Sequence, residues 1–282
     1  MGAAAIRGEA VALRPLLTTS LAQRFADAAT TLPIVEKRSV QVGSETKVVD
    51  EEYYYTTRYG TPLAYARPLE IVAGAGLTDV AGKRLVDFGY GGIGQLMMLA
   101  SLGAEAVGVD VDPTLRAMYA DRDGRFGSGS LRTLEGRWPA DTPVRDAVGG
   151  GYDLFLSKNV LKRGYIHPAE PVPEKRQIRL GVDDEAFLRA VHALLKPGGL
   201  MLIYNLAPAP APPGKPYIPW ADGRSPFPRE LFERVGFRVV AFEIDDTVAA
   251  RNMARTLGWD RGPEAMDLTR DLFGQYTLVA KP

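Results

Sequence analysis

The feature that most constrains this chain is the run from Arg84 to Pro113, RLVDFGYGGIGQLMMLASLGAEAVGVDVDP. It predicts a buried strand ending at Gly89, a glycine turn, a helix over 93–104 and a second strand over 106–109. Glycine has no Cβ and tolerates positive φ, so the turn lets a ligand lie against bare main chain. The run therefore predicts an α/β fold whose first turn faces a ligand.

The acid that closes the second strand, Asp110, indicates the kind of ligand. Free N–H groups at the start of the 93–104 helix would face that ligand. Asp110 lies roughly 20 residues beyond Gly89, where a carboxylate can accept hydrogen bonds from a ribose. Together these positions predict a nucleotide-type cofactor site.

The glycines alone fit two cofactors. Gly89, Gly91 and Gly94 satisfy G-x-G-x-x-G, the dinucleotide fingerprint of Rossmann dehydrogenases. Asp87 stands before the first glycine, and DFGYG followed by GVDVDP resembles the first two motifs of class I S-adenosylmethionine-dependent methyltransferases. In that family the D-x-G-x-G turn holds the methionine part and the later acid holds the ribose. We favour the methyltransferase interpretation over the dehydrogenase one.

Four later segments resemble the same family in the same order. YDLFL (152–156) followed by SKN resembles its fourth strand, and FLRAVHALLKPGG (187–199) resembles the helix and turn before its fifth. Segments 236–245 and 275–282 resemble its sixth and seventh strands. The resemblance covers roughly 77–282 and implies a seven-stranded, mostly parallel sheet with helices on both faces and an antiparallel last strand.

We expect two parts, an N-terminal extension (1–76) and a methyltransferase domain (77–282). The extension is predicted to contain a helix over 13–32, a β-hairpin within 38–55 and a helix beginning at Pro62. This extension would serve as a lid or as a homodimer contact.

Two insertions interrupt the predicted domain. Segment 207–227 is rich in proline yet carries aromatic residues, so we expect it to form a wall of the substrate pocket. Segment 246–273 is predicted to be an amphipathic helical insertion, with apolar positions at Val248, Met253, Leu257 and Trp259.

The resemblance implies a set of cofactor-binding residues, although two positions depart from the family pattern. Ile93 stands where a third glycine is common, and Arg137 and Trp138 follow Gly136 where an acid often holds the adenine amino group. We expect Arg137 or Trp138 to stack on the adenine instead, with Trp138 as a core anchor being the alternative. The predicted set is Asp87, Gly89, Tyr90, Gly91, Asp110, Val111, Arg137, Trp138 and Ser157.

Methyl transfer requires an in-line nucleophile and, where the nucleophile carries a proton, a base. SKNVLKRGYIHP (157–168) follows the fourth strand, where the family presents residues to cofactor and acceptor. His167 is the candidate base because imidazole titrates near neutrality, with a loop histidine bonded to backbone as the alternative. His192 is expected to be structural. Lys158 is the second candidate catalytic residue. If the segment is helical, Lys158 and Lys162 lie one turn apart on one side of it, and Lys158 would face the cofactor.

The acceptor is predicted to be a small molecule, and an anionic one is suggested by Lys158, Lys162 and Arg163. Tyrosines crowd the segment ahead of the first strand; one or two of them would close the site, while packing in the core is the alternative. The predicted substrate-binding residues are Tyr59, Tyr65, Arg163, Tyr217 and Trp220.

Composition narrows the class of protein. Lys plus Arg and Asp plus Glu both number 34, which gives a net charge of zero and no electrostatic case for nucleic acid. There is no cysteine and no apolar run near the ~20 residues of a membrane span. Arg7 and Glu9 stand where an export signal would need its apolar core, so we expect none. Asn159 and Asn205 alone make a poor metal cage, so no metal is expected. We expect a cytoplasmic protein.

The sequence thus predicts S-adenosylmethionine-dependent O- or N-methylation of a small molecule. The alternatives are an NAD(P)-dependent oxidoreductase of Rossmann type, transfer of the aminocarboxypropyl arm of the same cofactor, and a non-catalytic protein that binds the cofactor.

Overall fold

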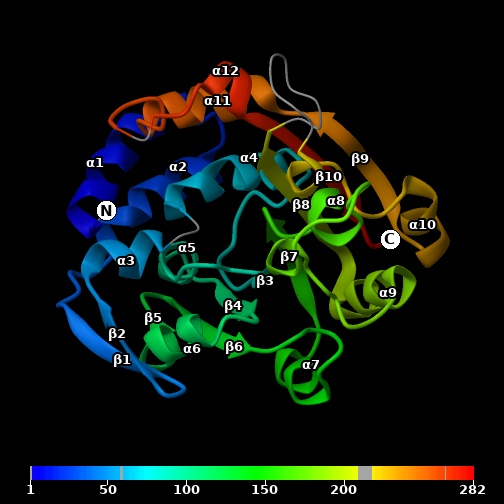
Figure 1. Ribbon diagram of the computed structural model, residues 1–282, viewed down its shortest axis with the longest axis horizontal. Helices are drawn as coiled ribbons and strands as arrows, with labels where there is room; N and C mark the ends of the chain where they lie inside the picture. Colours follow the sequence, from blue (N-terminus) through cyan, green and yellow to red (C-terminus); the bar gives the residue numbers. More distant parts are fainter. Residues whose placement is uncertain (1, 58–59, 209–217, 264) are drawn as a thin grey trace. The chain divides into compact units, whose positions relative to one another are not determined.

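The structure is a computed structural model that describes residues 2–57, 60–208, 218–263 and 265–282 (Figure 1). The chain divides into two compact units. Unit 1 is Met1–Arg137 with Pro143–Val148, and unit 2 is Trp138–Thr142 with Gly149–Pro282. Segment 2–76 falls in unit 1, and its separation from the rest as an extension stays a prediction.

The sheet of unit 1 has the strand order β5-β6-β4-β3. Strands β3, β4 and β6 are parallel, as expected for the first three strands, and the short β5 is an addition that pairs antiparallel with β6. Helices α5 and α6 pack against this sheet. The elements are β3 (Arg84–Phe88), β4 (Glu105–Asp110), β5 (Gly124–Phe126), β6 (Gly129–Glu135), α5 (Gly94–Ser101), α6 (Pro113–Tyr119) and α7 (Thr142–Val148).

The start of the chain differs from the expectation. The single helix predicted over 13–32 is wrong: α1 (Ala3–Leu13) runs into a 3-10 turn, and α2 (Ser20–Asp27) begins afresh. The cause is Thr19, whose backbone is extended and whose hydroxyl caps α2 by accepting a hydrogen bond from the Ala22 N–H at 3.3 Å. The apolar spacing predicted a continuous helix and gave no sign of the break before α2.

The rest of segment 2–76 follows the prediction more closely. The expected hairpin is confirmed as β1 (Arg38–Val42) and β2 (Glu45–Val49), a separate two-stranded sheet. After it the chain is helical, because Asp50 caps α3 (Glu51–Thr56) by accepting a hydrogen bond from the Tyr53 N–H. The helix expected at Pro62 is confirmed as a 3-10 turn that continues into α4 (Ala66–Gly74).

The sheet of unit 2 has the order β7-β8-β10-β9. β7 and β8 are parallel, whereas β10 is antiparallel to both β8 and β9, which confirms the predicted antiparallel last strand and, with unit 1, the α/β fold class. The elements are β7 (Tyr152–Lys158), β8 (Leu195–Ala207), β9 (Arg238–Asp245), β10 (Phe273–Ala280), α8 (Arg163–Ile166), α9 (Asp184–Leu194), α10 (Arg229–Val235), α11 (Thr247–Thr256) and α12 (Leu268–Asp271).

The predicted helical insertion between β9 and β10 is present, but the prediction that Val248 lies on its apolar face is wrong. Val248 is 76% exposed, while Thr247, Ala250, Met253 and Ala254 of α11 are buried. Small residues therefore bring α11 onto β10, and the large aliphatic Val248 lies outside that contact. His192, in α9, packs edge-on against Phe237 with ring centroids 5.0 Å apart, as expected of a structural residue.

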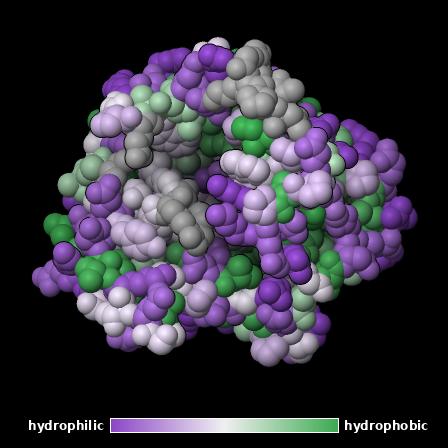
Figure 2. All heavy atoms as spheres, in the orientation of Figure 1, coloured by the Kyte–Doolittle hydropathy of each residue, from purple (hydrophilic) through white to green (hydrophobic). Residues whose placement is uncertain are grey.

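Hydrophilic residues cover most of the face shown in Figure 2. Among the described helices, none has the length and apolarity needed to cross a membrane.

The cap that Thr19 provides at the start of α2 can be tested by mutation. Thr19→Ala removes the cap and should lower the free energy of unfolding by about 0.5–2 kcal/mol in urea denaturation. Thr19→Ser keeps the capping oxygen and should stay near wild type. Equal stability of Thr19→Ala and wild type would contradict the capping role.

Candidate functional site

The glycine turn after β3 has the backbone that the sequence predicts. Gly89 and Gly91 have φ of 73° and 60°, a region that residues with a Cβ rarely adopt. The Gly92 N–H closes the turn by donating to the Tyr90 carbonyl oxygen at 2.6 Å. The Tyr90 side chain is buried near Tyr119, so contact of Tyr90 with a cofactor would be made by its main chain.

Asp87 is buried at the end of β3 and holds a polar network. Gln95 of α5 donates from Nε2 to Asp87 Oδ2 at 3.0 Å and to the Tyr90 carbonyl oxygen at 2.6 Å. Tyr65 also hydrogen-bonds Asp87, and burial, followed by the charge of Asp87, raises the pKa of its hydroxyl well above the ordinary value. Gln95 was missed by sequence reasoning; its signal is a polar residue in the otherwise apolar stretch QLMMLA.

The segment ahead of α4 lies over the glycine turn. Thr57 donates from its hydroxyl to the Gly91 carbonyl oxygen at 3.0 Å. Pro62 packs so tightly on the start of α5 that a Cβ added to Gly94 would lie 2.8 Å from the proline Cγ. Gly94 is thus a point of close approach, which gives a physical reason for a glycine one position later than the family pattern. Tyr59 lies outside the described residues.

Asp110 ends β4 beside the turn. Its carboxylate accepts hydrogen bonds from the Asp112 N–H at 3.0 Å and from the Gly91 N–H at 3.3 Å, while burial raises its pKa above the ordinary value. The next residue, Val111, is 61% exposed despite being apolar. A carboxylate linked to the glycine turn and an exposed apolar side chain next to it fit a ribose and a flat base.

Arg137 and Trp138 have different environments. Arg137 is exposed at the end of unit 1. Trp138 is 4% exposed in unit 2, where its ring lies 5.7 Å from that of Phe155 and 5.8 Å from that of Phe187. The structure therefore makes Trp138 a core anchor, the alternative considered from sequence, and contact of either residue with a cofactor stays a prediction.

In unit 2, the loop after β7 is tied to the end of β8. Ser157 is buried and its hydroxyl accepts a hydrogen bond from the Leu161 N–H at 3.2 Å. Asn159 has φ of 64°, and its Oδ1 accepts from the Leu206 N–H at 2.7 Å. Ser157 thus shapes the loop here, and its predicted contact with a cofactor stays a prediction.

The two lysines near this loop are buried. Lys158 is the last residue of β7 and Lys162 precedes α8, so the expectation that they share one side of a helix is wrong. Lys162 donates from Nζ to the Leu206 carbonyl oxygen at 2.8 Å and lies 5.0 Å from the centre of the Tyr165 ring. Burial, and then the like charge of Lys158, lowers the pKa of Lys162 to about 7.

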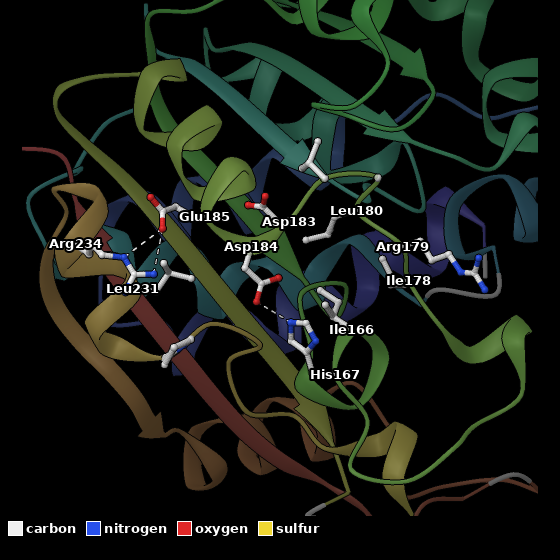
Figure 3. A pocket seen from close by; sticks show the side chains of 13 residues that line it. Ile166, His167, Ile178, Arg179, Leu180, Asp183, Asp184, Glu185, Leu231 and Arg234 are labelled. Atoms are coloured by element: carbon white, nitrogen blue, oxygen red, sulfur yellow. Dashed lines mark hydrogen bonds and ion pairs between the residues drawn. The ribbon is translucent and has the colours of Figure 1, made fainter.

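His167 lies in an open groove of unit 2 with a volume of about 920 Å³. Its Nε2 is 2.8 Å from Asp184 Oδ2, and Figure 3 shows the two side chains pointing toward each other. Sequence reasoning did not find Asp184, which begins α9 and is separated from His167 in the chain by a proline-containing stretch. The groove is lined by Ile166, His167, residues 178–185, Pro228, Leu231 and Arg234.

The remaining predicted substrate residues are only partly brought together. Arg163 is exposed at the start of α8, and its backbone N–H donates to the Arg224 carbonyl oxygen. Trp220 lies in a 3-10 turn in contact with α8, and the Arg176 guanidinium lies 4.3 Å from its ring centre. Tyr217 lies outside the described residues. Within the described ranges, no group of three or more His, Cys, Asp or Glu could hold a metal ion.

The comparisons with known proteins agree with this fold, although no protein-family model matches the chain. The chain is 30% identical over 128 residues and 32% identical over 130 residues to ubiquinone biosynthesis O-methyltransferases of two strains of Cereibacter sphaeroides. Each alignment covers 44% of this chain and 42% of the relative, so the chain matches less than half the length of these enzymes.

A solved structure shows the same architecture. Phosphoethanolamine N-methyltransferase 2 of Haemonchus contortus, in complex with phosphomonomethylethanolamine and S-adenosylhomocysteine, is 15% identical and has a TM-score of 0.50, covering 82% of this chain and 56% of that one. The chain has the fold of class I S-adenosylmethionine-dependent methyltransferases, and it is a distant relative of ubiquinone O-methyltransferases.

The contact between Pro62 and Gly94 can be tested by adding one methyl group. Gly94→Ala should lower the free energy of unfolding by about 1–3 kcal/mol, because the new Cβ meets a rigid ring. The control is Gly8→Ala in α1, which has open space around it and should be neutral or stabilising by about 0.5–1 kcal/mol. A Gly94→Ala protein as stable as wild type would show that Pro62 does not pack against the start of α5.

Proposed function

We propose that this protein transfers the methyl group of S-adenosylmethionine to an oxygen or nitrogen of a small molecule. The observation that carries the proposal is the cradle at the ends of β3 and β4, where Gly89 and Gly91 have positive φ and Asp110 hydrogen-bonds the turn. The fold and the relatedness to O-methyltransferases support the same reaction class.

The residues of unit 1 fit the cofactor. The main chain of Gly89 and Gly91 would hold the methionine part, the Asp110 carboxylate the ribose hydroxyls, and Val111 the adenine face. Asp87 sits behind the turn and positions it through Gln95. When bound, the sulfonium supplies an activated methyl group, so this chain's residues need only orient the acceptor, exclude water and remove a proton.

His167 is the proposed base. With Nε2–H donated to Asp184 Oδ2, the imidazole presents Nδ1 as the acceptor of a proton from a hydroxyl or ammonium group in the groove. The carboxylate holds the ring in one orientation and stabilises the imidazolium that forms. Apolar side chains such as Ile178 and Leu231 line the same groove and suit the body of a small molecule.

The other assignments belong to the same proposal. Lys158 is retained as a catalytic candidate, and Tyr65, Arg163 and Trp220 as acceptor contacts, with Tyr59 and Tyr217 as predictions outside the described residues. Transfer of the aminocarboxypropyl arm would use the same cofactor cradle and is distinguished by the mass of the product. A cytoplasmic location and a homodimer remain predictions.

The cofactor assignment is tested by calorimetry. S-adenosylhomocysteine should bind the wild-type protein and NAD⁺ should not, and Asp110→Ala should weaken binding by roughly tenfold or more, because a carboxylate bonded to ribose contributes about 1.5–3 kcal/mol. Asp79→Ala is the control, since Asp79 is exposed and paired with Arg24. Preference for NAD⁺ would favour the oxidoreductase alternative and overturn the proposal.

The base assignment is tested by kinetics once an acceptor is found in a screen of small phenols, carboxylic acids and amines. His167→Ala should lower kcat by about 10²–10⁴-fold while leaving S-adenosylhomocysteine affinity unchanged. Asp184→Asn should lower kcat less, because it leaves the base in place. Loss of cofactor affinity equal to the loss of turnover would contradict the role of His167.

A further inference from the structure

The residue that follows α3 has a backbone conformation that its residue type rarely adopts. Thr57 has φ of 43° and ψ of −151°, although its side chain is branched at Cβ. Positive φ is a true outlier for a β-branched residue, whereas glycine adopts it at little cost. Such strain persists only where the surrounding structure holds the residue in place, and it concentrates at functional sites. A threonine rather than a glycine at this position therefore indicates that the side chain is needed.

The Thr57 side chain reaches the glycine turn of unit 1. Its hydroxyl lies 3.0 Å from the Gly91 carbonyl oxygen and 2.8 Å from the Thr56 carbonyl oxygen, and its one proton can be donated to either. The bond to Thr56 is local, because the two residues are adjacent. The bond to Gly91 joins positions 34 residues apart in the chain, so it ties the end of α3 to the turn after β3.

Gly91 is the centre of the turn, and its N–H and carbonyl groups are both held. The N–H donates to Asp110 Oδ2 at 3.3 Å, and the carbonyl oxygen accepts from Thr57. The Gly92 N–H donates to the Tyr90 carbonyl oxygen at 2.6 Å, which closes a three-residue turn around Gly91. Three-residue turns with positive φ at the centre, here 60°, are rare and strained. Thr57 and Asp110 therefore fix the direction in which the main chain at Gly91 points.

The helix that precedes Thr57 is itself fixed on this part of unit 1. The Tyr54 carbonyl oxygen accepts a hydrogen bond from the Tyr119 hydroxyl at 2.7 Å. A Cβ added to Gly92 would lie 3.5 Å from the Tyr55 carbonyl oxygen. Helix α3 thus contacts both α6 and the glycine turn, so a displacement of the turn would be transmitted to α3 and a displacement of α3 to the turn.

We propose that Thr57 is a positioning residue for the cofactor, whose hydroxyl holds the Gly91 main chain in the orientation that binds the methionine part of S-adenosylmethionine. The inference rests on the proposed function, because it gives a residue outside the turn the task of shaping the cofactor site. Coupling between two sites is reciprocal, so bound cofactor stabilises the segment ahead of α4, residues 51–57 and 60–65. Thr57 acts through Gly91, and its effect therefore lies in binding rather than in the chemical step.

The first test measures the binding of S-adenosylhomocysteine to the protein by calorimetry. Thr57→Val keeps the shape of the side chain and removes the hydroxyl, so the dissociation constant should rise by about two- to tenfold, as expected for one lost hydrogen bond. Thr57→Ser keeps the hydroxyl and should bind within about twofold of wild type. A role in packing alone would not be rescued by the smaller serine.

The matched control is Thr56→Val. The Thr56 hydroxyl donates to the Glu52 carbonyl oxygen at 2.7 Å within α3, so its removal should leave affinity for S-adenosylhomocysteine unchanged. The melting temperature of each ligand-free variant shows whether it has folded. If Thr57→Val does not fold, Thr57→Gly takes its place, because glycine adopts positive φ without strain and also lacks the hydroxyl.

The second test measures backbone amide hydrogen exchange with and without S-adenosylhomocysteine. Saturating ligand should slow exchange in residues 51–57 and 60–65 of wild type by roughly fivefold or more, because binding adds to the free energy of opening. The slowing should be smaller in Thr57→Val, where no hydroxyl joins the segment to Gly91. Strand β9 of unit 2 is the internal reference and should exchange at the same rate in both conditions.

Four results would overturn the inference. They are wild-type affinity in Thr57→Val, an equal loss of affinity in Thr56→Val, failure of Thr57→Ser to restore binding, and exchange in residues 51–57 and 60–65 that does not respond to the ligand. In each of these cases the proposed function stands as long as wild type binds S-adenosylhomocysteine. Failure of wild type to bind that ligand would overturn the proposed function and the role of Thr57 together.

Discussion

The hydrogen bonds that the Asp87 carboxylate makes at the end of β3 are the interaction on which the rest of unit 1 depends. Through Gln95 and Tyr65 this one buried acid links the first strand, the helix after the glycine turn and the segment that precedes α4. A buried carboxylate needs such partners, so the network fixes the positions of three elements at once. The turn between them is left with main chain as its surface, and the N–H of Gly91 is further bonded to Asp110. The conformation of the proposed cofactor site therefore depends on the hydrogen bonds that Asp87 accepts.

Unit 2 supplies a different kind of chemistry. Lys158 at the end of β7 and Lys162 before α8 are both buried, and the groove carries His167 beside the Asp184 carboxylate. Both features lie in the stretch from the end of β7 to the start of α9. In the proposed function, proton removal would come from this stretch of unit 2, and the cofactor would be held by residues of unit 1.

The sequence predicted most of the fold because its strongest signals are local. The strand, glycine turn and helix around Gly89 and the hairpin at 38–49 follow from spacing and composition within short windows. The antiparallel last strand was instead implied by the resemblance to the methyltransferase family. The errors arise where a single side chain overrides a pattern, as when Thr19 starts a new helix or Val248 lies outside the apolar contact. The site was predicted less well, because Gln95, Asp184 and the contact of Pro62 with Gly94 depend on tertiary proximity. Trp138 had two interpretations from sequence, and only the packing against Phe155 and Phe187 favours one.

In the proposed function, the turn after β3 and Asp110 at the end of β4 hold an adenosyl cofactor. A crystal structure of the protein with S-adenosylhomocysteine tests it most directly. In that structure the amino-acid part of the ligand should lie against the main chain of Gly89 and Gly91, the ribose hydroxyls within hydrogen-bond distance of Asp110, and the adenine against Val111. A ligand bound elsewhere, or a ribose that makes no contact with Asp110, would contradict it.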